Sequence, residues 1–155
     1  MKRIFSVLAI LAAFIFTASP LFAQKAQNKA QRQQWMNNMI QSKTEFVVKE
    51  IGLNDSNVKA KFEKQYTTMC HEIARLGRDT RNMERTVSKK DNPSDLEYEK
   101  CAEAMAEHKI KEGNIEMKYF NQFKKYLTQK QLFNLKIAEH KWMNVLMKHR
   151  GKGNK

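Results

Sequence analysis

The chain has 155 residues, a length that suits a single domain, and it carries 29 lysines and arginines against 16 aspartates and glutamates, a formal net charge of +13. It contains no glycine-rich phosphate loop, no nucleophile elbow and no zinc-protease helix motif. The enzyme classes that depend on these motifs are therefore disfavoured. We expect a protein that is not an enzyme and that holds no cofactor.

The N-terminus has the layout of a secretory signal peptide. The basic pair Lys2 and Arg3 precedes an apolar run over 4–16, and small residues lead to a cleavage site after Ala23. The apolar run is too short to span about 30 Å of hydrocarbon. Because no charge occurs between the basic pair and Lys25, an uncleaved anchor is the alternative.

Cleavage after residue 23 would leave 27 basic and 16 acidic residues, a formal charge of +11. Outside the cytosol, this charge favours an anionic membrane surface and acidic or unfolded polypeptides as partners, rather than nucleic acid. The alternative is that the charge serves only to keep the chain soluble.

Few glycines and prolines interrupt the chain, which predicts long helices. Residues 24–34 are rich in Gln, Lys and Asn and are predicted to form a disordered polar segment. A first helix is predicted over about 34–51 from apolar residues at helical spacing, and Gly52 suits the left-handed position that ends a helix. The helical domain is expected over 35–149, and a disordered basic tail over 150–155.

A second helix is predicted over about 54–87, with Asn54 as its N-terminal cap and Leu53 packed on Val58. Its apolar residues recur in steps of three and four, the spacing that presses one helix against another. Gly77 lies inside the helix, next to this seam. The seam consists of Phe62, Tyr66, Met69, Ile73, Leu76, Thr80, Met83 and Val87.

A third helix is predicted from a cap at Ser94 or Asp95 to about Tyr126, and it carries two apolar stripes. A helix with one partner needs one stripe, so two stripes indicate either contact with a second protomer or a place in the middle of its own bundle. One stripe holds Tyr98, Cys101, Met105, Ile115 and Tyr119, and the other holds Ala102, Ala106, Ile110, Gly113, Met117 and Phe120.

A fourth helix, which reaches about His149, opens with a readable capping box. The Thr128 side chain is predicted to accept from the N–H of Gln131, and the Gln131 side chain from the N–H of Thr128, while Leu127 packs on Leu132. The segment Leu53, Asn54 and Asn57 has the same layout at the start of the second helix.

These two segments resemble the pair of Leu-Thr-x-x-Gln motifs of the periplasmic Spy/CpxP family. The second motif matches in full at Leu127, Thr128 and Gln131, and the first is degraded at Leu53, Asn54 and Asn57. The order of signal peptide, short helix, long helical pair and final helix is also similar, over roughly residues 36–149.

The resemblance implies an all-α, four-helix protomer with two long central helices, assembled as an antiparallel, cradle-like homodimer in the periplasm. It implies an ATP-independent, chaperone-like protein that binds unfolded or client polypeptides under envelope stress. The alternative is a periplasmic sensor or regulator that docks on a membrane histidine kinase and responds to metal. A trimeric helical chaperone of the Skp type is disfavoured by the interrupted helices.

The candidate client-binding surface lies mainly on the middle helices, where cations would steer a client and exposed apolar patches would hold it. Met143 and Met147 share one face of the last helix, and flexible methionines suit a surface with many partners, although a core role is the alternative. The candidate basic contacts are Lys61, Lys64, Arg75, Arg78, Arg81 and Arg85.

Cys70 and Cys101 are the only cysteines, and an oxidising compartment would permit a disulfide between them. If the long helices turn at 88–93, the two residues are mismatched by about ten positions, or about 15 Å of helix. A disulfide needs Cα atoms within about 7 Å. An intrachain bond, an intermolecular bond and free thiols are the alternatives.

His71 and His108 are the candidates for a metal site. His71 adjoins Cys70, and His108 follows Cys101 by two helical turns. Neither has the close pairing of a dedicated site, so no bound metal is expected and surface or helix-end histidines are the default.

Overall fold

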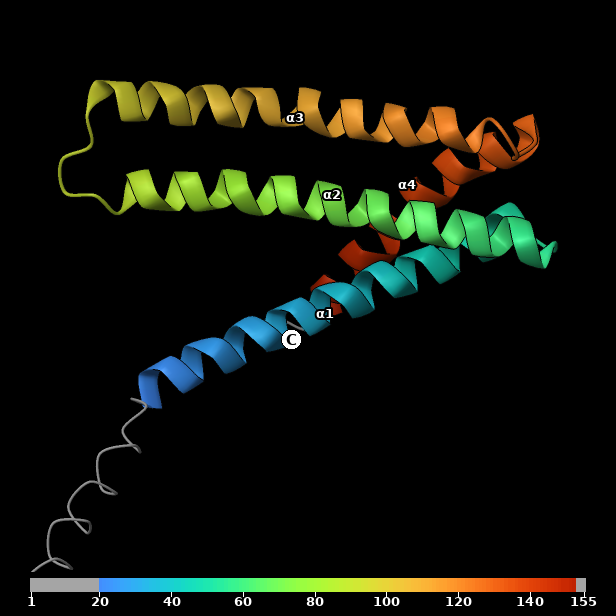
Figure 1. The fold of residues 1–155 in the computed structure, drawn as a ribbon, viewed down its shortest axis with the longest axis horizontal. Coiled ribbons are helices and arrows are strands. Elements are labelled where there is room, and N and C mark those ends of the chain that lie inside the picture. Colours follow the sequence, from blue (N-terminus) through green and yellow to red (C-terminus); the bar gives the residue numbers. More distant parts are fainter. Residues whose placement is uncertain (1–19, 153–155) are drawn as a thin grey trace, which may run out of the picture. The chain divides into compact units, whose positions relative to one another are not determined.

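The structure is a computed structural model that describes residues 20–152, with side chains described over 27–146. It contains four helices and, in these residues, no strand (Figure 1). The helices are α1 (Pro20–Ile51), α2 (Ser56–Ser88), α3 (Asp95–Phe123) and α4 (Gln129–Lys152). The all-α prediction is confirmed. The apolar run over 4–16 lies outside the described residues, and none of the described helices is long and apolar enough to cross a membrane.

The chain divides into two compact units, Met1–Met39 and Ile40–Lys155. In the first unit, α1 already includes residues 24–34, so the prediction of a disordered segment there is wrong. Although residues 27–35 are exposed, Gln, Lys, Ala and Arg are good helix formers, and no glycine or proline interrupts them. Similarly, α4 extends to Lys152, beyond the start of the predicted tail at residue 150.

The core of the second unit is an aromatic cluster where α2 and α3 meet. The rings of Phe62 and Tyr66 stack with centroids 5.2 Å apart, and Phe62 lies 5.0 Å from Phe123. All three side chains are fully buried, and rings of this size bury about 150–250 Å² each. The core is completed by Val47 and Ile51 of α1 and by Leu132, Leu135 and Ala138 of α4.

Two polar contacts and one aromatic contact connect α4, the C-terminal part of α1 and this end of α2. The Tyr66 hydroxyl donates to Glu139 of α4 at 3.1 Å, and burial raises the pKa of this tyrosine far above its ordinary value. The hydroxyls of Thr44 and Thr67 lie 3.4 Å apart, which joins α1 to α2. The rings of Phe46 and Trp142 lie 5.5 Å apart and join α1 to α4.

Helices α2 and α3 form an antiparallel hairpin (Figure 1) in which most of the buried residues lie at the end remote from the turn, although Cys101 near the turn is also buried. Along the predicted seam, Phe62 is fully buried, Leu76 is half-buried and Met83 is 42% exposed. Among the described residues, the interhelical hydrogen bonds and ion pairs of residues 72–90 are all with α3. A pair of helices covers only one face of each, so the opposite faces stay in solvent.

The two predicted stripes of α3 have different environments. In the stripe that faces α2, Cys101 and Tyr119 are buried, whereas Tyr98 and Met105 are about half exposed. The other stripe does not lie inside the bundle, because Ile110 is 65% exposed and Met117 57% exposed. We call its exposed members the outer stripe: Ala102, Ala106, Ile110, Gly113 and Met117.

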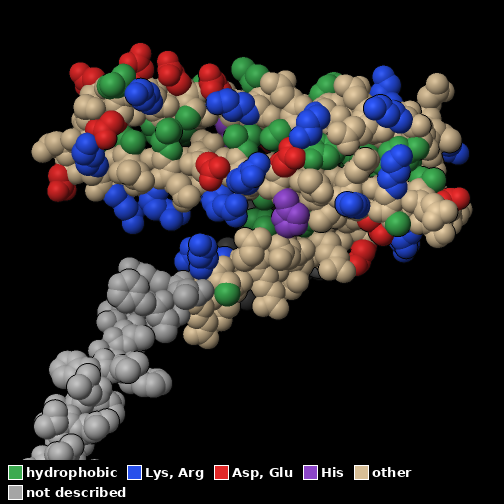
Figure 2. Space-filling view, viewed as in Figure 1, with side chains coloured by type: hydrophobic (Ala, Val, Ile, Leu, Met, Phe, Trp, Pro, Cys, Tyr) green, Lys and Arg blue, Asp and Glu red, His purple; other side chains and the backbone are tan. Residues whose placement is uncertain are grey.

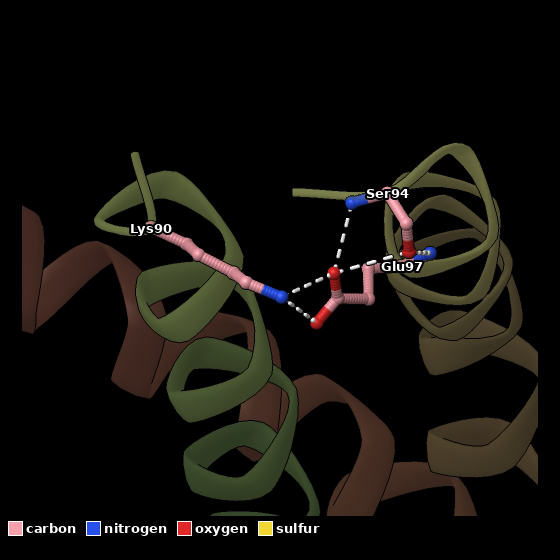
Figure 3. Close-up of polar contacts among 3 residues, drawn as sticks. All are labelled: Lys90, Ser94 and Glu97. Carbon is pink, nitrogen blue, oxygen red and sulfur yellow. Dashed lines mark hydrogen bonds and ion pairs between the residues drawn. The ribbon is translucent and has the colours of Figure 1, made fainter. Parts of the chain in front are cut away.

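The turn between α2 and α3 is fixed by a capping box at Ser94 (Figure 3). The Glu97 N–H donates to the Ser94 hydroxyl at 3.4 Å, and the Glu97 carboxylate accepts from the Ser94 N–H at 2.9 Å. Lys90, which follows α2, donates to the same carboxylate at 2.7 Å. Of the two predicted caps, Ser94 is the one used.

The chain reverses between α1 and α2 at Gly52, which has φ = +68°. A side chain at Gly52 would meet no atom within 4 Å, so backbone conformation alone requires glycine here. Gly77 has ordinary helical geometry, and an added Cβ would lie 3.1 Å from the mobile end of the Arg81 side chain.

Gly52→Ala is expected to lower the free energy of unfolding by about 1 kcal/mol, because an L-residue is strained at positive φ. Gly77→Ala is the matched control and is expected to raise it by up to about 1 kcal/mol, because alanine favours the helix and Arg81 can move. Urea unfolding of the two variants measures both changes. Equal effects of the same sign would contradict this account of the two glycines.

Hydrogen bonds from Lys90 and Ser94 lower the pKa of the Glu97 carboxyl to about 2. A depressed pKa means that the contribution of Glu97 to stability is present above its ordinary pKa and is lost as the pH falls toward about 2. Carbon-detected NMR titration should give Glu97 the lowest pKa along α3, and Glu97→Gln should flatten the decline in stability across this range. Titration of Glu97 near its ordinary value would show that the box does not persist in solution.

Candidate functional site

The outer face of α2 carries most of the predicted basic contacts. Four arginines follow one another in steps of three and four along α2, and the guanidinium of one of them, Arg81, lies over Gly77. We call them the arginine row: Arg75, Arg78, Arg81 and Arg85. All four side chains are exposed, and within residues 27–146 none takes part in an ion pair. In that part of the chain, no carboxylate lies within ion-pairing distance of these four guanidinium groups.

The two edges of the hairpin differ in charge. Figure 2 shows Lys and Arg side chains along the α2 edge and Asp and Glu side chains along the α3 edge near the turn. Between residues 95 and 107, α3 has five carboxylates and one lysine. An acidic or flexible polypeptide would therefore be attracted to the arginine row rather than to this part of α3.

Lys61 and Lys64 are exposed at the other end of α2, where they line a groove between α2 and α3 of about 440 Å³. The Lys61 ammonium lies 4.5 Å from the ring centroid of Tyr126. Across the groove, Lys118 donates to Glu72 at 2.7 Å and Tyr119 donates to the same carboxylate at 2.6 Å. These hydrogen bonds lower the pKa of Glu72, Lys118 having the larger effect, so the carboxylate stays ionised near neutral pH and offsets the charge of Lys118. Lys61 and Lys64 are then the cations of the groove that have no ion pair within residues 27–146.

Exposed apolar side chains accompany these cations. Met143 is 57% exposed and so does not have a core role, while the side chain of Met147 lies outside the described part of the chain. The sequence pattern did not single out Phe133 and Ile137, which are 67% and 40% exposed on α4. Their spacing of four residues is the available signal, because it places both on one helical face.

The full motif at the start of α4 has the predicted geometry. The Gln131 N–H donates to the Thr128 hydroxyl at 3.2 Å, and the Thr128 N–H donates to the Gln131 side chain at 3.0 Å. Leu127 and Leu132 are both buried beside this box. The motif therefore acts as a helix start that anchors α4 in the core.

The degraded first motif is not a capping box. Asp55, and not Asn54, caps α2, and its carboxylate accepts from the N–H groups of Asn57 and Val58. Leu53 is buried as expected, whereas Asn54 and Asn57 are exposed. The prediction failed because Asn54, Asp55 and Ser56 are all good capping residues, and sequence alone does not fix which of them has the extended backbone.

Cys70 and Cys101 are both buried, free thiols. Along the antiparallel hairpin, Glu72 pairs with Tyr119 and Thr80 with His108, so the two cysteines lie at different heights and form no intrachain bond. Burial raises the pKa of the Cys70 thiol to about 11, which makes it a poor nucleophile near neutral pH.

His108 packs between α2 and α3, where its ring nitrogen Nδ1 lies 3.2 Å from the Thr80 hydroxyl. Its Nε2 lies 3.9 Å from Glu112, and its ring lies beside Gly77. His71 is half-buried on α2. In the part of the chain that the structure describes, no three His, Cys, Asp or Glu side chains come together as metal ligands.

Comparison with protein-family models, with curated proteins and with solved structures gives no match.

The cap assignments predict different effects on stability for substitutions at two adjacent residues. Asp55→Ala should lower the free energy of unfolding by about 1 kcal/mol, whereas Asn54→Ala should leave it nearly unchanged. Thr128→Ala, which removes the other cap, should also cost about 1 kcal/mol. Urea unfolding of the three variants tests this; a loss at Asn54 equal to that at Asp55 would show that the cap is misassigned.

Proposed function

We propose that the chain is a periplasmic, ATP-independent holder of unfolded or client polypeptides that works as a homodimer. The observation that carries this proposal is the exposed arginine row on a hairpin that also leaves large apolar side chains in solvent. The resemblance of the Leu127 motif to the Spy/CpxP family supports the same function.

Capture begins with charge. The arginines of α2 have no carboxylate partners in the described residues, so they attract acidic segments of an approaching chain over about a Debye length, roughly 10 Å at 0.1 M salt. Such steering raises the association rate more than it raises the final affinity.

Apolar side chains then hold the client. Met83 lies on α2 and Met105 on α3, each between 40 and 50% exposed, and Phe133 and Met143 are separate exposed apolar side chains on α4. Full burial of one such side chain is worth about 1.5–3 kcal/mol, whereas a micromolar complex needs about 8 kcal/mol. Several scattered contacts must therefore act together. Such binding is weak and has little specificity for the client's sequence.

Flexible methionines suit this task, because an unbranched thioether adapts to differently shaped partners. The buried core is the aromatic cluster, which lies at the end of the hairpin opposite Met83 and Met105. A client can therefore bind and leave without the core opening. No nucleotide is needed for such a cycle of binding and release.

The test is suppression of the aggregation of an unfolding model protein, followed by light scattering. Wild type at several-fold molar excess should suppress aggregation, and Arg75→Glu, Arg78→Glu and Arg85→Glu together should reduce suppression several-fold. Raising salt to about 1 M should weaken wild type in the same direction, because the screening length falls to about 3 Å.

A matched control changes the net charge equally at exposed cations off the hairpin: Arg32→Glu, Lys49→Glu and Lys130→Glu. This variant should keep most of the activity. No suppression by wild type would end the proposal, and equal loss in both variants would show that net charge, rather than the arginine row, attracts the client.

A further inference from the structure

The groove between α2 and α3 beside the aromatic cluster has no part in the proposed capture of clients. Its volume is about 440 Å³, and it is lined by Lys61 and Lys64 of α2 and by Gln122 of α3. The lining also includes Tyr119, whose side chain is only 5% exposed. Cations beside a largely buried ring suit an organic anion rather than a bare ion.

The lining of this groove contains no carboxylate. Its remaining members, Gln65, Thr68 and Lys118, are likewise polar or basic. Two other grooves of the described chain differ in this respect: one is lined by Glu45 and Glu63, and the other by Glu116 and Glu139. An anion would therefore meet repulsion from the lining in those two grooves but not in this one.

Two acceptors at the groove already have donors within the protein. The Glu72 carboxylate, which lies beside the lining, accepts from Lys118 and from Tyr119. The amide oxygen of Gln65 accepts from the Tyr126 hydroxyl at 2.8 Å. Burial raises the pKa of Tyr126 to about 12, so this hydroxyl keeps its proton and remains the donor near neutral pH.

Several donors of the lining, in contrast, are unused. Because Tyr126 occupies the oxygen of Gln65, the amide N–H groups of Gln65 are left for another partner. Within residues 27–146, Lys61 and Lys64 have no ion pair, and the Gln122 side chain makes no hydrogen bond. The lining therefore offers donors and positive charge, and a ligand rich in acceptors would satisfy them.

The arrangement of the lysines indicates how much negative charge the ligand carries. Lys61 and Lys64 are three residues apart on α2, so their ammonium groups share one side of the helix and repel each other. The Lys61 ammonium is also held 4.5 Å from the ring centroid of Tyr126. A phosphate monoester, with a charge of about −1.5 to −2 near neutral pH, would relieve this repulsion.

We propose that the groove binds a phosphate monoester. The phosphate would lie between the ammonium groups of Lys61 and Lys64 and accept from the amides of Gln65 and Gln122, with its organic part beside Tyr119. A carboxylate fits less well, because its single charge matches only one of the two free ammonium groups. The ester can be a soluble molecule or the headgroup of a lipid.

NMR titration of the full chain with phenyl phosphate, at about 0.15 M salt, tests the site. Amide signals of residues 61–68 and 118–122 should shift and saturate. Lys61→Gln and Lys64→Gln together should weaken binding about tenfold, because charge-assisted hydrogen bonds are lost. Lys49→Gln and Lys130→Gln together remove the same charge at exposed lysines elsewhere and should bind as wild type does. No saturable shift in wild type, or equal weakening in both variants, would overturn the inference.

A second pair of variants adds charge instead of removing it. Gln122→Glu places a carboxylate in the groove and should abolish the shifts. Asn121→Asp adds the same charge at an exposed neighbouring position outside the lining and should retain them. Circular dichroism should show unchanged helicity in both variants. Undiminished binding by Gln122→Glu would contradict the assigned site even if the lysine variant does not fold.

Vesicles distinguish the two sources of the phosphate. If a lipid headgroup is the ligand, the chain should co-sediment with phosphatidylcholine vesicles that contain phosphatidic acid, and Gln122→Glu should not. If the ligand is soluble, only phenyl phosphate should bind. Binding of neither probe would overturn the inference. Because these assays contain no unfolded protein, such a failure would not bear on the proposed holding of clients.

Discussion

The contact between Phe62 and Phe123 is the interaction on which the rest of this structure depends. It joins α2 to α3 near the end of the hairpin remote from its turn, and Tyr66 extends it toward Glu139 of α4. Because the large rings, the buried leucines of α4 and the valines of α1 all gather there, the hydrophobic stabilisation is concentrated in one place. The half of the hairpin near its turn has fewer buried apolar contacts, and only α2 and α3 make them.

That uneven distribution leaves the turn half of the hairpin with exposed helical faces. A hairpin of two helices covers one face of each, and the two remaining faces differ: that of α2 carries arginines, and that of α3 carries an apolar seam between an acidic and a basic half. The face of α2 is the one on which the proposed capture of a charge-steered client depends. Both surfaces lie on helices outside the aromatic cluster, so binding need not involve unfolding of the core.

Sequence reasoning located the seam of α2, the two stripes of α3 and the box at Thr128 and Gln131, because helical spacing and capping chemistry are local properties. The sequence could not predict how deeply each seam residue is buried. Phe62 and Met83 occupy equivalent seam positions, yet Phe62 is buried and Met83 is 42% exposed. Burial depends on which helices cover a position, and that is set by contacts distant in sequence.

The errors have equally specific causes. Residues 24–34 were expected to be disordered from their polarity, but helix propensity, rather than burial, decides the conformation of an exposed helix. At the start of α2, three consecutive residues are good caps, so the sequence does not determine which one is used. The backbone turns at Gly52 and gives Asp55 the extended conformation of the cap. The cysteines are not among these errors: the mismatch of about ten positions expected from the sequence is the hairpin register that separates Cys70 from Cys101, and both thiols are free.

Amide hydrogen exchange along α2 tests the central claim, that the stability of the hairpin is concentrated at its aromatic end. Amides around Tyr66, Met69 and Cys70 should exchange at least about a hundredfold more slowly than those around Met83 and Thr86, since local opening is easiest where few apolar contacts are buried. Uniformly slow exchange from one end of α2 to the other would contradict the account, because it would require an even core along the whole hairpin.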